Sequence, residues 1–158
     1  MKYILFSAVL IFLSFNAHSQ SFEETLKFIQ TNINEFQYKN PASLLSHSHE
    51  ITVSQYGEMS VHRIINNELK SKTKVYLQNV DTSVVETIDR NMYRLWLGST
   101  SLKPFTILSI DDGNNIETND SIAFLMGSLI DSNKLANAFK HLIKLAKENP
   151  NFREKDIF

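Results

Sequence analysis

The chain has 158 residues, and its 16 lysines and arginines nearly balance 17 aspartates and glutamates, for a formal net charge of −1. A dedicated nucleic-acid binder needs a basic surface to displace counterions from phosphates, so this balance argues against nucleic acid as a partner. The chain contains no cysteine, which excludes a disulfide framework and lipid attachment through a cysteine. Its length suits one domain with a core of its own.

Residues 1–19 have the three-part layout of a secretory signal peptide. Lys2 supplies the positive start, an apolar run follows over Tyr3–Phe15, and small residues stand at Ala17 and Ser19. The run is shorter than the roughly 20 residues of a comfortable membrane span. We therefore expect cleavage between Ser19 and Gln20, a secreted or periplasmic location, and a protein that is not an integral membrane protein.

One globular domain is expected over residues 20–150, with a loosely ordered tail over 151–158. The domain begins with a predicted helix over residues 22–37, because Ser21 and Glu24 form a capping-box pattern. Its apolar residues recur at helical spacing: Phe22, Leu26, Ile29, Ile33 and Phe36.

The middle of the chain alternates between polar and apolar residues, as β-strands do. We expect strands over residues 49–56, 57–65, 72–80, 91–99, 104–110 and 121–130, while 81–90 fits either a strand or a short helical turn. Gly57 and the Asp-Gly of "DDGNN" (residues 111–115) mark hairpin turns. Six or seven short strands with close connections predict a mostly antiparallel sheet or barrel.

The segment "SNKLANAFKHLIKLAKENP", residues 132–150, predicts an amphipathic helix. Asp131 or Ser132 would cap it and Asn149-Pro150 would end it. Its apolar stripe comprises Leu135, Ala138, Phe139, Leu142, Leu145 and Ala146, with Ile143 beside it. The stripe could face a membrane, a second copy or the chain's own sheet. One Phe and no Trp disfavour a membrane, and the spacing lacks sustained heptads, so we expect packing on the chain's own sheet.

Antiparallel strands followed by one C-terminal amphipathic helix resemble the pleckstrin-homology-like superfold over roughly residues 47–147. The resemblance implies two bent sheets packed nearly at right angles, with Phe139 and Leu142 on the helix that plugs one end. It gives the expected fold class: α+β, an antiparallel six- to seven-stranded bent sheet or barrel capped by a C-terminal helix, with an extra N-terminal helix. The first hairpin carries only Arg63 where phosphoinositide-binding members carry several basic residues. The resemblance therefore implies a binding scaffold and not that lipid-headgroup function.

Two groups of residues could bind a metal. In a strand His47 and His49 share a face, as a two-histidine ligand pair requires, and His62 is the best third ligand. The segment "DDGNNIETND" gathers acidic residues that would suit calcium, although the spacing of a calcium loop is not matched: Asp111, Asp112, Glu117 and Asp120. A tight turn with acidic edges explains that segment better.

The chain contains no G-x-S-x-G nucleophile elbow and no phosphate-binding glycine loop. We predict a non-enzymatic exported binding module, without assigned catalytic residues, metal site or cofactor, whose ligand is a partner protein or a small apolar or envelope-derived molecule. Trp96 and Tyr93 lie on opposite faces of one expected strand, so we expect at least one large aromatic on the outer face, as a candidate contact residue. The alternatives are a metal-binding protein or metal-dependent hydrolase using His47, His49 and His62, and an envelope lipid carrier. The oligomeric state stays open.

Overall fold

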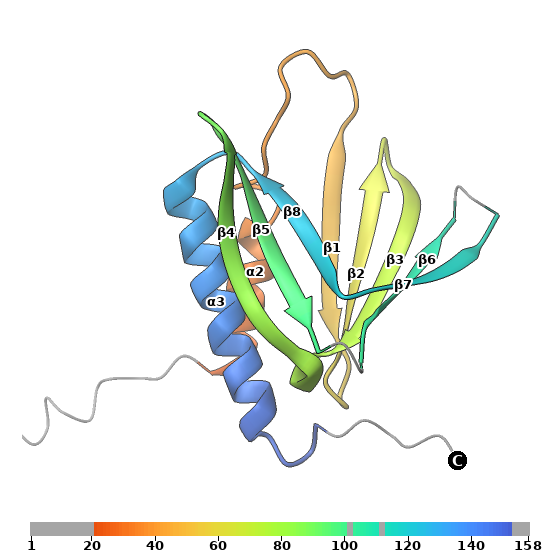
Figure 1. Cartoon of the computed structure of the whole chain (residues 1–158), viewed down its shortest axis with the longest axis vertical. Helices are drawn as coiled ribbons and strands as arrows, with labels where there is room; N and C mark the ends of the chain where they lie inside the picture. Colours follow the sequence, from red (N-terminus) through yellow and green to blue (C-terminus); the bar gives the residue numbers. More distant parts are fainter. Residues whose placement is uncertain (1–20, 101–102, 111–112, 153–158) are drawn as a thin grey trace, which may run out of the picture.

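The computed structural model describes residues 21–100, 103–110 and 113–152; the predicted signal peptide lies outside the described residues. These residues form an α+β fold with two helices and eight strands (Figure 1). The elements are α2 (Phe22–Asn32), β1 (His47–Val53), β2 (Glu58–Ile65), β3 (Glu68–Tyr76), the 3-10 turn η1 (Leu77–Asn79), β4 (Val80–Asp89), β5 (Met92–Ser99), β6 (Phe105–Ser109), β7 (Asn115–Asn119), β8 (Ser121–Met126) and α3 (Leu129–Glu148).

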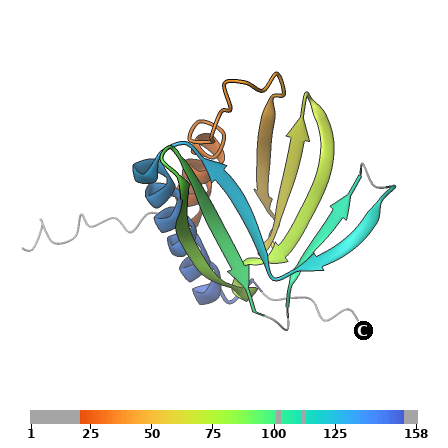
Figure 2. The same cartoon turned by 45° about the horizontal axis from the view of Figure 1, so that its top comes forward.

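The strands form two antiparallel sheets that face each other at an angle (Figure 2). The first sheet has five strands in the order β1-β2-β3-β6-β7, and the second has three in the order β4-β5-β8. Only Asp120 separates β7 from β8, so the chain passes from one sheet to the other at that corner. The chain also changes sheet between β3 and β4, through the η1 turn, and between β5 and β6.

The expectation of a barrel is wrong, because neither sheet closes on itself in the described part of the chain. The strands β1 and β8 do not pair, and their edges bond to other groups. Along β1, the side-chain amide of Asn34 bonds to both main-chain groups of His49: Nδ2 donates to the His49 carbonyl at 2.9 Å, and Oδ1 accepts from the His49 N–H at 2.7 Å. The Gln30 Nε2 atom donates to the Ile51 carbonyl at 2.8 Å. These side-chain amides replace a neighbouring strand.

Helix α2 is shorter than the predicted span 22–37. Its capping box is confirmed, since Ser21 Oγ accepts from the Glu24 N–H and the Glu24 carboxylate accepts from the Ser21 N–H. The helix ends at Asn32 because the chain then extends along the end of β8. There Gln37 bridges to Met126, and the Tyr38 N–H donates to the Leu125 carbonyl at 2.9 Å.

Eight strands replace the six or seven that were predicted. The missed strand is β7, whose five residues are all exposed and therefore show no apolar alternation. Its main chain pairs with β6 from Asn115 to Asn119. The ambiguous segment 81–90 is the strand β4, which pairs with β5.

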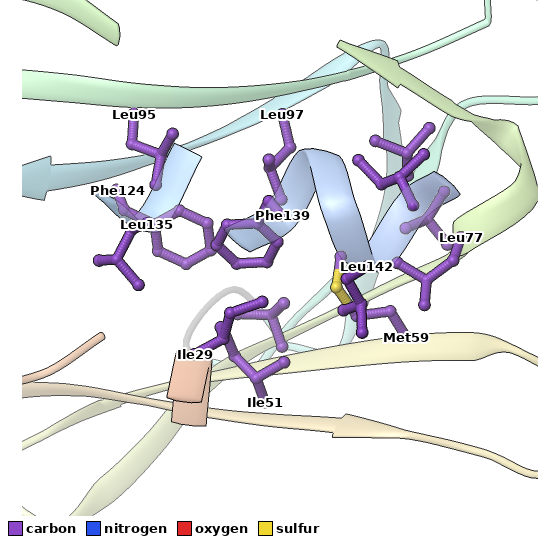
Figure 3. Packing of buried hydrophobic residues seen from close by; sticks show 14 of the residues in the cluster. Ile29, Ile51, Met59, Leu77, Leu95, Leu97, Phe124, Leu135, Phe139 and Leu142 are labelled. Carbon is purple, nitrogen blue, oxygen red and sulfur yellow. The ribbon is translucent and has the colours of Figure 1, made fainter. Parts of the chain in front are cut away.

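The interior is filled by apolar side chains from α2, α3 and both sheets (Figure 3). Leu135, Phe139 and Leu142 of α3 are 0% exposed, which confirms that the helix packs on the chain's own β-structure. The Phe139 ring stacks on Phe124 of β8 with centroids 6.0 Å apart. Leu145, expected in the stripe, is only half-buried, whereas Ile143 is buried.

The ends of α3 also differ from the prediction. The helix begins at Leu129, and its cap is Ser128, whose Oγ accepts from the Asp131 N–H. Asp131 and Ser132, the predicted caps, lie inside the first turn. Just past its other end, Phe152 is buried and meets the Phe22 ring edge-on at 5.0 Å, so it is packed although the tail was expected to be loose. Residues 153–158 lie outside the described residues.

Neither described helix combines the length and the apolar character that crossing a membrane requires.

Candidate functional site

The inner face of the five-stranded sheet changes from apolar to polar along its strands. Strand register places side chains in rows that cross the sheet. One row consists of Ile51, Val61, Thr73 and Ile107. The next row, farther from the core, is wholly polar: His49, Arg63, Ser71 and Ser109. The core covers the apolar part of this face, and the polar row is left as the floor of a cleft.

The cleft has a volume of about 380 Å³ and lies between this floor and strand β8. Its apolar lining includes Val61, Ile107, Ile122 and Phe124, and its polar lining includes Thr73, Glu117 and Asn119. This volume lies within the range of small-ligand sites, which combine apolar walls with a few polar groups. The cleft can therefore hold a ligand of mixed character.

His49 stands where the floor meets β8. Its ring meets Phe124 edge-on, with centroids 5.1 Å apart, and its Nδ1 atom is buried without a hydrogen-bond partner among the described residues. Burial, with smaller effects of Arg63 and His47, lowers the pKa of His49 from 6.5 to about 4. His49 is therefore neutral at neutral pH.

Arg63 lies directly opposite His49 on the neighbouring strand and is exposed to the cleft. Many other cations are paired: Lys74 Nζ lies 2.6 Å from Glu58 Oε1, and Lys147 Nζ lies 3.1 Å from Asp81 Oδ1. Arg63 has no carboxylate partner in the described ranges. Among the residues that the structure describes, the positive charge of Arg63 on the cleft floor is therefore uncompensated.

Strand β8 borders the cleft with an open main-chain edge. The Leu125 carbonyl accepts from Tyr38 and so points away from β5. Because main-chain direction repeats every second residue, the N–H and C=O of Ala123 point the same way. Ala123 lines the cleft, and no described strand pairs with β8 on that side. Around Ala123, this edge can pair with an added extended segment.

Trp96 forms part of the rim, on the outer face of the three-stranded sheet. Its indole N–H donates to Glu86 Oε2 at 2.9 Å, and the Arg94 guanidinium carbon lies 4.9 Å from its ring centroid. Tyr93 of the same strand packs against the core, which confirms that the two aromatics face opposite ways. Trp96 reaches the cleft across its small neighbour Ala123.

The structure does not bring the three predicted metal-binding histidines together. His47 and His49 share the inner face, but His62 pairs with Glu50 on the outer face, where Nδ1 of His62 lies 3.9 Å from Glu50 Oε2. Within residues 21–100, 103–110 and 113–152, no group of three or more histidines or acidic residues could hold a metal ion. The predicted triad does not form because successive side chains of a strand point to opposite faces of the sheet. On β2, Arg63 points to the inner face, so its neighbour His62 points to the outer face.

Strands β6 and β7 form a hairpin, as the sequence indicated. Gly113 and Asn114 have positive φ, 72° and 64°, as a tight turn requires. Glu117 lies on β7 and lines the cleft, while Asp111 and Asp112 lie outside the described residues.

A second cavity of about 530 Å³ lies under the segment that links α2 to β1. Its walls include Tyr38, Leu45, Met92 and Leu125, and His47 lies at it. The segment carries Leu44, which is fully exposed. This cavity is separate from the mixed cleft, and its lining includes the exposed Lys39.

Sequence reasoning missed the cleft, although one signal was present. Arg63, Ser71 and Thr73 occupy positions that alternate in step with the buried Val61 and Val75, so they had to share the inner face. Polar residues at inward positions mark a place where the core ends.

Comparisons of the chain with protein families, with curated proteins and with solved structures found no match.

Proposed function

We propose that this chain is an exported, non-enzymatic binding module that holds an extended segment of a partner protein in the cleft, added as a further strand to the open edge of β8. The observation that carries the proposal is that the open edge of β8 borders a cleft. In such recognition, main-chain hydrogen bonds supply affinity and the pockets for alternate side chains supply specificity.

The cleft offers both kinds of contact. The main chain of Ala123 supplies a donor and an acceptor, and the neighbouring apolar side chains Ile107, Ile122 and Phe124 offer area for burial. Trp96 at the rim is the type of residue that dominates interface energies when a partner covers it. Its indole is already oriented by Glu86, so little conformational entropy would be lost on binding.

Peptide selection tests this function. A displayed library of random dodecapeptides is selected on the mature protein and then compared on the Ala123→Pro variant, which removes the outward N–H and is tolerated where a strand edge faces solvent. We expect the enriched peptides to lose most of their binding to the variant while its circular dichroism stays unchanged. Equal binding to both proteins, or no enrichment, would contradict the proposal.

Export is the second part of the proposal, and the layout of residues 1–19 supports it. Expression of the whole chain in a bacterium should give a product outside the cytoplasm whose N-terminal residue is Gln20. A product that stays in the cytoplasm with Met1 or Lys2 at its N-terminus would refute this part alone.

A relation to the pleckstrin-homology-like superfold also belongs to the proposal. Two bent antiparallel sheets followed by one C-terminal helix support it. The open gap between β1 and β8 is a departure, and it is the feature on which the proposed binding mode depends.

A further inference from the structure

We infer that the partner segment carries a carboxylate, which binds to Arg63 and His49 on the floor of the cleft. This inference rests on the proposed function and adds the chemistry that the site selects. The carboxylate can belong to an Asp or Glu side chain or to the C-terminus of the partner, and the experiment separates these sources.

The first argument is the charge balance of the cleft. Arg63 has no carboxylate partner among the described residues, and its neighbours in the row are neutral: His49 on β1 and Ser71 on β3. The acidic side chain in the lining is Glu117 on β7, and strands β3 and β6 separate β7 from the strand of Arg63. A guanidinium beside hydroxyls matches a carboxylate, which it binds with two parallel hydrogen bonds.

The second argument is the state of His49. Its Nδ1 is buried without a partner, whereas Nε2 is not enclosed in this way. An unpaired buried N–H is rarer in proteins than an unpaired acceptor. The neutral ring therefore places its proton on Nε2, where it can donate to a ligand in the cleft. His49 and Arg63, opposite each other in the register, then offer donors to one acceptor group.

The third argument is the geometry of an added strand. Side chains of an extended segment alternate between its two faces. A segment that pairs with Ala123 places every second side chain over the floor, where Arg63 and Ser71 lie, and the others toward the rim at Trp96. An acidic residue at a floor position meets Arg63 without leaving the extended conformation.

The same site makes binding depend on pH. The charged and titratable groups that face His49 are Arg63 and His47 from the first sheet, with Glu117 farther away on β7; the β8 residues that line the cleft are uncharged. A bound carboxylate offsets the effect of Arg63 and favours the protonated ring. Binding should therefore raise the pKa of His49 and become tighter as the pH falls from 7 toward 5.

The experiment uses the ¹⁵N-labelled mature protein and three probes, followed by NMR titration. The probes are acetyl-Thr-Val-Glu-Val-Thr-amide, the same peptide with Gln in place of Glu, and the Gln peptide with a free C-terminal carboxylate. We expect the Glu amide or the Gln acid to shift the Ala123 amide and the Arg63 Nε–H, with a Kd at least about tenfold below that of the Gln amide. Which of the two binds more tightly identifies the source of the carboxylate.

Matched variants complete the test. Arg63→Gln should abolish the preference for the carboxylate, and Arg63→Lys should retain part of it. Lys72→Gln is the control: it changes the net charge as much as Arg63→Gln does, but Lys72 lies on the outer face, so the preference should stay intact. Equal binding of the Glu and Gln amides at Ala123 would overturn the inference and leave the proposed function standing. Absence of any shift at Ala123 with all three probes would overturn both.

Discussion

A single residue, His49, is responsible for part of the acid sensitivity of the fold. It is held neutral between Phe124 and Arg63, with its pKa lowered to about 4, whereas in the unfolded chain it titrates near 6.5. Between these pH values the unfolded state binds more protons than the folded state. The contribution of His49 to stability is therefore present above pH 6.5 and is lost as the pH falls to 4.

We expect acidification from pH 6.5 to 4 to remove on the order of 2–3 kcal/mol of unfolding free energy through His49. Urea denaturation at a series of pH values measures it. His49→Leu should flatten this part of the profile. A His49→Leu profile parallel to that of the native chain would show that other groups cause the acid sensitivity.

At Gly57 a side chain is disfavoured for two separate reasons, the backbone conformation and the lack of space. Its φ is +81°, and a Cβ there would lie 2.9 Å from the Phe152 ring. Gly57→Ala should lower the unfolding free energy by about 1–2 kcal/mol from backbone strain, with a further loss from displaced packing. Gly113→Ala is the matched control, since its φ is +72° but no atom lies within 4 Å. Thermal denaturation should rank Gly57→Ala as the costlier change; equal costs would refute the packing part.

At the scale of elements, helix α2 and the residues after it supply hydrogen-bond partners for strand edges that no other strand pairs with. Gln30 and Asn34 satisfy the edge of β1, and residues 36–38 satisfy the end of β8. An uncovered edge strand is a template for pairing with other chains. The molecule thus covers one edge and leaves the Ala123 stretch of β8 accessible beside the cleft.

Asn34→Ala should cost about 1–2 kcal/mol, because the N–H and C=O of His49 each lose their partner. Asn32→Ala is the control, since the Asn32 amide donates only to the Phe28 carbonyl of its own helix. Chemical denaturation measures the cost, and light scattering should show earlier aggregation for Asn34→Ala alone. A smaller loss for Asn34→Ala than for Asn32→Ala would contradict this role.

At the scale of the whole molecule, α3 joins both sheets and α2 into one core. Phe139 is fully buried and touches the second sheet through Phe124. Domains of this kind are stable by only about 5–15 kcal/mol. A single large truncation in this helix therefore removes a large part of the stability.

Phe139→Ala should cost about 3–5 kcal/mol, from lost burial and from the cavity that remains. Leu145→Ala, on the half-buried side of the same helix, should cost markedly less. Urea denaturation of both variants provides the comparison. Similar losses would mean that the helix is not anchored through Phe139, and the account of the core would be wrong.

Most elements could be predicted because their own residues carry the signal. Ile51, Met59, Val61 and Val75 alternate, and α3 shows its stripe without reference to any neighbour. The strand β7 could not be found this way, because main-chain pairing with β6 holds it while its side chains face solvent. The end of α2 was also wrong, since pairing with β8 outweighs local helix periodicity after Asn32.

In the candidate site, too, the alternation within one strand could be predicted, whereas the pairing between strands could not. Local sequence placed His47 and His49 on one face, because alternation within a strand is a property of the backbone. It could not place Arg63 beside His49, or His62 away from it, because register between strands depends on the turn at Gly57. From the amino-acid sequence alone come the antiparallel strands and the helix that buries Phe139. Only the tertiary structure decided that the two sheets stay open at β1 and β8, since that depends on the side-chain amides of Gln30 in α2 and of Asn34 just after it, which compete with a strand for main-chain groups of β1.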